Sequence, residues 1–134
     1  MGKLDELGLA ENTLVIYFND NGMETKAKGS CYEGGIHIPV MFRWPGTLEP
    51  GTRDDFISNI DFVPTIFELC GVEKPENMKL DGRSLVPLIE GETPADWRTS
   101  VYSEIGYTRS VTTKDWKFIA FKVPPSVNRT REER

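Results

Sequence analysis

Between residues 19 and 35 the sequence NDNGMETKAKGSCYEGG gathers side chains that could bind a metal ion and an anion. Asp20 offers a carboxylate oxygen and Asn21 a neutral amide oxygen, a mixture that suits hard cations such as Ca²⁺ or Mg²⁺. Two ligands are too few for either ion, so further donors would have to come from elsewhere. A plain Asp-Asn-Gly turn, common after any strand, accounts for the same pair without a metal.

Two lysines follow this pair closely. A lysine beside a divalent cation can hold an anionic group and stabilise negative charge on a leaving oxygen, which makes Lys26 and Lys28 candidates for anion binding. Tyr32 and Glu33 could orient Lys28, or could simply pack and cap the local structure. Solvated surface lysines remain the alternative explanation, since most lysines in proteins are exposed.

The single histidine and the two cysteines carry less information. His37 is a substrate-binding candidate only, because a lone histidine on a strand is more often a packed or surface residue than a catalyst. Neither Cys31 nor Cys70 forms a CxxC pair, and two cysteines make no disulfide framework. We therefore expect both to be free thiols.

The composition is that of a soluble, globular and acidic chain. It has 134 residues, a net charge of −5 and a pI near 4.9, which argues against nucleic-acid binding because such proteins usually show a basic face. A few placed lysines could still bind an anion. No apolar run approaches the length of a membrane-spanning helix, so no membrane span is expected.

The candidate metal ligands directly follow an apolar run. Leu14–Phe18 comprises five consecutive apolar residues and fits a strand covered on both faces, as in a parallel sheet between helices. Ligands of open α/β sheets bind just beyond the carboxyl ends of strands, where Asp20 and Asn21 stand. A second extended segment should be interrupted or begin near Pro39, because proline cannot donate to a ladder.

Two helices and a hairpin are expected further along. The helix after Asp61 should end at Gly71 and bury residues at i, i+3, i+4 and i+7 spacing: Val63, Ile66, Phe67 and Cys70. A shorter helix should point three residues inward: Leu85, Leu88 and Ile89. Near the end, Thr113-Lys114-Asp115 is typical of a hairpin turn, with a return strand at 116–121.

Taken in order, six segments resemble the C-terminal part of the sulfatase family, within the alkaline-phosphatase-like superfamily. The segments are NTLVIYFNDNG, KGSCYEGGIHIPVMFRWPG, NIDFVPTIFELCGV, LDGRSLVPLIEG, VYSE and TKDWKFIAF. They cover about residues 8–121. The DNG that follows the first strand is closer to sulfatases than to phosphonate monoester hydrolases, which carry Asp-His at that place.

The resemblance implies a role for each candidate residue. Asp20 and Asn21 match the pair that ligates the active-site cation, usually Ca²⁺. Lys28 matches the catalytic lysine that contacts the sulfate group and helps the leaving oxygen depart. The family's nucleophile is a formylglycine made from a cysteine or serine in a Cys-x-Pro/Ala-x-Arg motif. Neither Cys31 nor Cys70 lies in such a motif, so no nucleophile is expected in this chain.

The resemblance also implies an α/β fold, part of a sulfatase-type mixed sheet with flanking helices that ends in a small antiparallel β subdomain with a helix. We expect residues 1–95 to form the C-terminal part of the catalytic α/β domain, residues 96–123 the small subdomain, and residues 124–134 a flexible tail. The N-terminal half, with the formylglycine and the remaining metal ligands, is expected to be missing.

Function follows the same resemblance. We expect a segment of a sulfuric ester hydrolase that acts on sulfate esters in the full-length protein and is inactive alone. The alternatives are a segment of a phosphonate or phosphodiester hydrolase and a non-catalytic remnant that self-associates. Exposed strand edges favour a homodimer or a domain swap. The family is commonly periplasmic, secreted or lysosomal, and the sequence leaves the compartment open.

Overall fold

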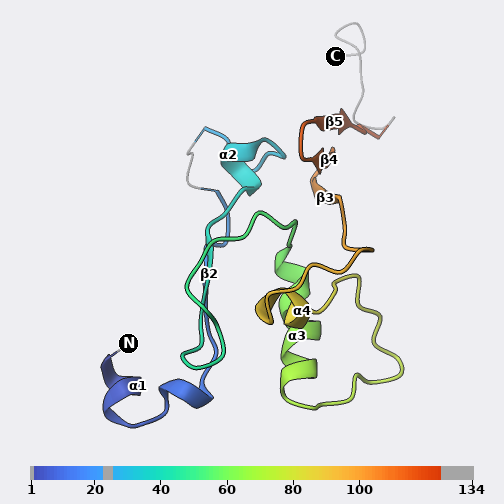
Figure 1. Cartoon of the computed structure of the whole chain (residues 1–134). Helices are drawn as coiled ribbons and strands as arrows, with labels where there is room; N and C mark the ends of the chain where they lie inside the picture. Colours follow the sequence, from blue (N-terminus) through green and yellow to red (C-terminus); the bar gives the residue numbers. More distant parts are fainter. Residues whose placement is uncertain (1, 23–25, 125–134) are drawn as a thin grey trace, which may run out of the picture. The chain divides into compact units, whose positions relative to one another are not determined.

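A computed structural model describes residues 2–22 and 26–124 of the chain (Figure 1). Its elements are α1 (Gly2–Glu6), the 3₁₀ helix η1 (Ala10–Asn12), β1 (Val15–Phe18), α2 (Glu33–Ile36), β2 (Val40–Arg43), the 3₁₀ helix η2 (Asn59–Asp61), α3 (Phe62–Leu69), α4 (Val86–Ile89), β3 (Ser100–Ile105), β4 (Thr108–Thr113) and β5 (Lys117–Phe121). Apart from Pro124, the tail expected at 124–134 lies outside the described residues. None of the helices in the described part is long and apolar enough to cross a membrane.

The described residues form two compact units. The first contains the residues up to Ile16 together with Met41–Thr99, and the second contains Tyr17–Val40 together with the residues from Ser100 onward. The expected division at residue 95 stays a prediction. The segment that carries the candidate site groups with the antiparallel strands and not with the rest of the α/β part.

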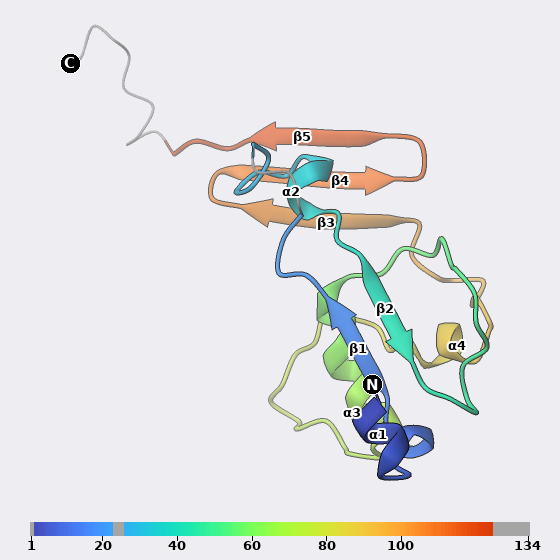
Figure 2. The same cartoon turned by 90° about the vertical axis from the view of Figure 1, so that its left-hand side faces the viewer.

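The second unit is built around the antiparallel sheet β3-β4-β5 (Figure 2). The hairpin turn predicted around residue 114 is confirmed, and the Thr113 N–H donates to the Trp116 carbonyl oxygen at 2.7 Å. On β4, Ser110 is buried, whereas its neighbour Val111 is 39% exposed on the opposite face. One face of the sheet is therefore covered and the other is open.

Strands β1 and β2 pair in a separate two-stranded sheet, in which they run in opposite directions (Figure 2). As predicted, β2 begins directly after Pro39. The expectation that Leu14–Phe18 is covered on both faces is wrong for the described chain, because Tyr17 is 52% and Phe18 is 44% exposed. A strand is buried on both faces only between two layers, and this small sheet provides no such layers.

Helix α3 corrects a second expectation. Val63 and Ile66 are 44% and 46% exposed, and Cys70 is also exposed, so the predicted apolar face is not buried. Phe62 and Thr65 are buried instead. The spacing of apolar residues indicated the helix correctly, and Gly71 follows its end with a φ of +61°, as glycine commonly does after a helix.

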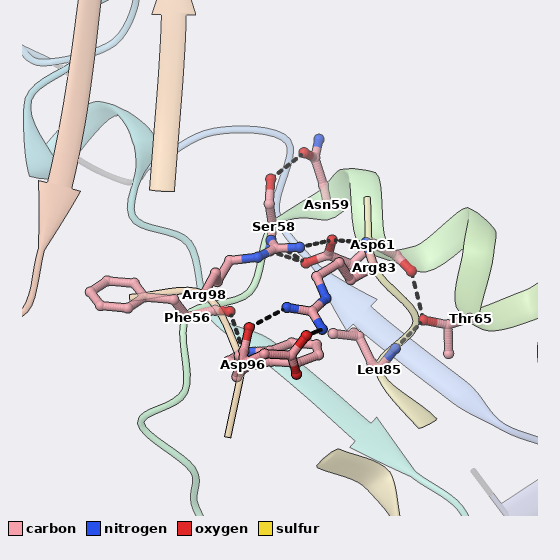
Figure 3. Close-up of polar contacts among 10 residues, drawn as sticks. Phe56, Ser58, Asn59, Asp61, Thr65, Arg83, Leu85, Asp96 and Arg98 are labelled. Carbon is pink, nitrogen blue, oxygen red and sulfur yellow. Dashed lines mark hydrogen bonds and ion pairs between the residues drawn. The ribbon is translucent and has the colours of Figure 1, made fainter. Parts of the chain in front are cut away.

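The orientation of α3 is set by Asp61, whose carboxylate is fully buried at the start of the helix (Figure 3). The backbone N–H groups of Ser58 and Arg83 donate to it at 2.7 and 2.8 Å. The Arg98 guanidinium adds two bonds at 2.7 and 2.6 Å, one to each carboxylate oxygen. This one side chain therefore joins three stretches of the first unit, and its negative charge is compensated by a paired cation.

Thr65 extends the same network by one turn of the helix. Its hydroxyl donates to the Asp61 carbonyl oxygen at 2.6 Å and accepts from the Leu85 N–H at 2.8 Å. This bond fixes the entry to α4, where Leu85, Leu88 and Ile89 are all buried as predicted. The buried edge of α3 thus includes polar groups, because Asp61 and Thr65 supply the bonds that dock the following segment.

Replacing Asp61 with alanine should destabilise the first unit strongly. The change leaves the Arg98 guanidinium, whose side chain is only 16% exposed, without its carboxylate. Breaking one partner of such a buried pair costs about 3–5 kcal/mol. The matched control is Asp96→Ala, which removes an ion pair to Arg83 from a side chain that is 80% exposed and should cost less than about 1 kcal/mol. Urea unfolding measures both, and equal losses would contradict this account.

Candidate functional site

The two candidate metal ligands lie in a turn just past β1. Asp20 is exposed, Asn21 is partly buried and Gly22 is buried. The Gly22 N–H donates to the Gly35 carbonyl oxygen at 2.9 Å. A Cβ at residue 22 would lie 2.2 Å from the Gly34 carbonyl oxygen, so only glycine fits there. The turn is therefore fastened to α2 by direct contact between two backbones.

The candidate anion-binding residue, Lys28, lies in a second turn that packs against the same helix. A Cβ at Gly35 would lie 2.3 Å from the Ala27 carbonyl oxygen and 2.8 Å from that of Ser30. The Ser30 hydroxyl donates to the Ala27 carbonyl oxygen at 2.6 Å and closes this turn. Lys28 lies between these two contacts and is exposed. The backbone segments that carry Asp20, Asn21 and Lys28 thus both pack against the glycines of α2.

The segment that contains Lys28 is seated on the β3-β4-β5 sheet. Cys31 is fully buried, and its Sγ lies 3.8 Å from the carbonyl oxygens of both Ser103 and Thr108. An ion pair between Glu33, the first residue of α2, and Lys117 of β5 forms the second attachment. Both attachments lie within the second unit, on strands more than sixty residues further along the chain.

His37 lies between α2 and β2 with an extended backbone, φ −79° and ψ 112°, and is not part of a strand. It caps the C-terminal end of α2, where its backbone N–H donates to the Glu33 carbonyl oxygen at 2.8 Å. Its Nδ1 lies 3.4 Å from the Glu33 carboxylate, and its side chain is 80% exposed. A role of His37 in substrate binding stays a prediction.

The donor chemistry of the turn fits a hard cation, although the set is incomplete. Asp20 and Asn21 offer the two kinds of oxygen that Ca²⁺ accepts. Among the described residues, no group of three or more His, Cys, Asp or Glu side chains could hold a metal ion. A metal centre that uses this pair therefore needs ligands from outside the described part of the chain.

A separate cavity of about 410 Å³ lies in the first unit and contains none of the candidate residues. Its lining residues are Asp5, Gly8, Ala10, Glu11, Arg43 and Pro45. The candidate site is thus defined by backbone contacts and not by the cavity.

Comparison with known proteins assigns the chain to a family. A family model described as N-sulphoglucosamine sulphohydrolase, C-terminal, matches residues 26–128. The chain belongs to the sulfatase family. This confirms the resemblance drawn from the order of the sequence motifs, including its restriction to the C-terminal part of the family.

Curated relatives agree with this assignment. The chain is 39% identical over 104 residues to human arylsulfatase A, and this alignment covers 68% of the chain and 20% of the relative. It is 37% identical over 110 residues to rat steryl-sulfatase, covering 68% of the chain and 19% of the relative. It is 33% identical over 135 residues to the N-acetylglucosamine-6-O-sulfatase of Bacteroides thetaiotaomicron, covering 88% of the chain and 24% of the relative. The chain thus spans about a fifth to a quarter of these proteins.

Solved structures confirm the fold. A phosphonate monoester hydrolase from Silicibacter pomeroyi matches with a TM-score of 0.79 at 27% identity, covering 90% of the chain and 28% of that protein. A protein solved in complex with its substrate D-glucosamine-2-N,6-O-disulfate matches with a TM-score of 0.75 at 31% identity, covering 90% of the chain and 27% of that protein. The expected α/β class with a small antiparallel sheet is therefore correct.

Replacing Gly22 with alanine should separate the Asp20–Asn21 turn from α2. The new methyl group would meet the Gly34 carbonyl oxygen, and such overpacking costs about 1–3 kcal/mol. Urea unfolding measures the loss, and amide chemical shifts should change around Gly35 and Lys28. The control is Gly51→Ala, where a Cβ meets nothing within 4 Å. An unchanged free energy of unfolding for Gly22→Ala would contradict the close approach of the two backbones.

Proposed function

We propose that this chain is a C-terminal segment of a sulfatase that hydrolyses sulfate esters. The observation that carries the proposal is the convergence of two segments on α2. Gly22 anchors the turn with Asp20 and Asn21, and Gly35 meets the turn with Lys28. The match to the sulfatase family model and the sulfatase relatives supports this chemistry and not another use of the same fold.

In this proposal Asp20 and Asn21 are two ligands of a divalent cation, Ca²⁺ or Mg²⁺. When bound, the ion supplies positive charge next to the oxygens of the sulfate group. Lys28 contributes a second positive charge from its own turn. Its ammonium group binds the sulfate and stabilises negative charge as it develops on the leaving oxygen. The two turns that carry these groups pack against the same helix.

The nucleophile has to come from outside this chain. Cys31 is fully buried, with its sulfur against two carbonyl oxygens of the sheet, and Cys70 lies at the end of α3. Neither stands in the motif that is converted to formylglycine. The isolated 134-residue chain should therefore be inactive.

A phosphonate monoester hydrolase is the second candidate. Two of the structurally similar proteins carry that name, at 27% and 26% identity and TM-scores of 0.79 and 0.77. The sulfatase proposal is favoured because sulfatase relatives reach 33–39% identity. Comparing turnover of an aryl sulfate with that of an aryl phosphonate monoester separates the two.

A chimera tests the proposed function. This chain would replace the aligned stretch of the Bacteroides thetaiotaomicron N-acetylglucosamine-6-O-sulfatase, whose remainder supplies the nucleophile. The chimera should hydrolyse a sulfate ester. Lys28→Ala should lower its kcat/KM by about 100-fold or more, because the ammonium group that stabilises negative charge on the leaving oxygen is removed. Lys114→Ala, at an exposed lysine of the hairpin turn, is the control and should leave kcat/KM unchanged. A folded chimera in which both variants behave alike would contradict the role of Lys28.

Metal removal in the same chimera tests Asp20 and Asn21. Chelation should abolish turnover, and added Ca²⁺ or Mg²⁺ should restore it. Asp20→Ala should raise the cation concentration required for half-maximal activity. The isolated chain serves as the negative control and should not hydrolyse 4-nitrophenyl sulfate with either ion.

Self-association of the isolated chain belongs to the same proposal. In the described part of the chain, β1 and β2 form a sheet of two strands, with no third strand beside either. Tyr17 and Met41 on these strands are 52% and 58% exposed. Edges of this kind invite pairing with a second chain. Light scattering should show a dimer or larger species, and a monomer at high concentration would contradict the prediction.

A further inference from the structure

Lys117 is an unusual lysine for a three-stranded sheet. Its side chain is only 16% exposed, whereas its neighbours Trp116 and Phe118 are 81% and 70% exposed. Successive residues of a strand point to opposite faces, so Lys117 belongs to the covered face of β5. An ammonium group in such a place costs free energy unless a carboxylate compensates it, and Glu33 is that carboxylate.

Glu33 links Lys117 to the candidate site. It is the first residue of α2, and the glycines that follow it receive both turns of the site. The Gly22 N–H bonds to the Gly35 carbonyl oxygen, and the Ala27 carbonyl oxygen lies against Gly35. Any displacement of α2 from the sheet therefore moves the Asp20–Asn21 turn and the Lys28 turn together.

We propose that Lys117 is a positioning residue that clamps α2 through Glu33 and thereby holds Lys28 in register with the Asp20–Asn21 turn. Lys117 does not itself bind the anion, because its ammonium group is already engaged by Glu33 and largely buried. The role of Lys28 as the anion ligand rests on the proposed function. The clamp itself rests on the ion pair and on the glycine contacts.

The segment that contains Lys28 also contacts the sheet through the thiol of Cys31. The Cys31 sulfur lies 3.8 Å from each of two carbonyl oxygens of the sheet. A thiol is a weak hydrogen-bond donor, so these contacts contribute little to fixing the position of the segment on the sheet. The ion pair between Glu33 and Lys117 adds a directed, charge-assisted bond at the start of α2.

Amide exchange of the full chain and sulfate titration of the sulfatase chimera, both followed by NMR, test the clamp. Lys117→Met removes the charge but keeps an unbranched side chain of nearly the same length. Glu33→Gln removes the same ion pair from its more exposed partner. Each should speed exchange of the Gly22 amide by about tenfold, the loss of one charge-assisted bond, while amides of the β3-β4 ladder keep their rates. Lys117→Arg should restore the rate. Lys114→Met, in the hairpin turn, is the control and should change nothing.

Inorganic sulfate, added with Ca²⁺ to the chimera that supplies the remaining metal ligands, provides the readout that a purely structural role would not move. In the unmodified chimera, sulfate should shift the Lys28 side-chain signals. In Lys117→Met and Glu33→Gln the apparent Kd for sulfate should rise in parallel with the exchange rate of the Gly22 amide. Lys117→Arg should return both towards their original values.

The possible outcomes separate the clamp from the proposed function. If Lys117→Met does not fold, Glu33→Gln decides, and an unchanged Gly22 amide in that variant overturns the clamp. Uniform acceleration of exchange across the whole unit would also overturn it, because Lys117 would then be a general stabilising residue. If sulfate shifts Lys28 but the Gly22 amide is unaffected in both variants, the clamp falls and the proposed function stands. If the Gly22 amide responds but sulfate never shifts Lys28, the proposed function falls and the positioning role falls with it.

Discussion

The site depends on backbone segments that approach too closely for any side chain to stand between them. Gly22 lies against the Gly34 carbonyl oxygen, and Gly35 lies against the carbonyl oxygens of Ala27 and Ser30. These contacts need no side chains, so they leave the exposed surfaces of both turns free for polar groups. A carboxylate, an amide and an ammonium group can then be presented from two turns that pack against one short helix. A bulkier helix would hold the same turns further apart.

The two units hold their parts together in different ways. In the first unit a fully buried carboxylate, Asp61, accepts four hydrogen bonds and joins α3 to the segments around Arg83 and Arg98 (Figure 3). In the second unit a three-stranded ladder forms the scaffold, and the segment with Lys28 is attached to it through Cys31 and Glu33.

Much of this structure could be predicted from local pattern, and the rest could not for identifiable reasons. The hairpin turn at Lys114 and the ends of the helices follow from turn chemistry, and the family follows from the order of its motifs. The buried face of α3 was predicted wrongly, because apolar spacing takes no account of Thr65 and Asp61, whose hydrogen bonds orient the helix. The pairing of Glu33 with Lys117 joins residues 84 positions apart, a distance that local periodicity cannot span. The only sequence signal for this ion pair was a lysine placed between Trp116 and Phe118 at the start of the predicted return strand, where alternation puts it on the face opposite to both aromatic residues.

Replacing the Ca²⁺ of the proposed site with a paramagnetic lanthanide ion tests the central claim most directly, because such an ion broadens the NMR signals of nearby nuclei. The claim is that the turn with Asp20 and Asn21 and the turn with Lys28 face one common site. It predicts that titration of the sulfatase chimera, which supplies the remaining metal ligands, broadens the Gly22 and Gly35 amides and the Lys28 side chain together, and that Asp20→Ala removes all three effects. Broadening at Asp20 and Asn21 that leaves Lys28 sharp, or broadening centred on other acidic residues, would contradict it.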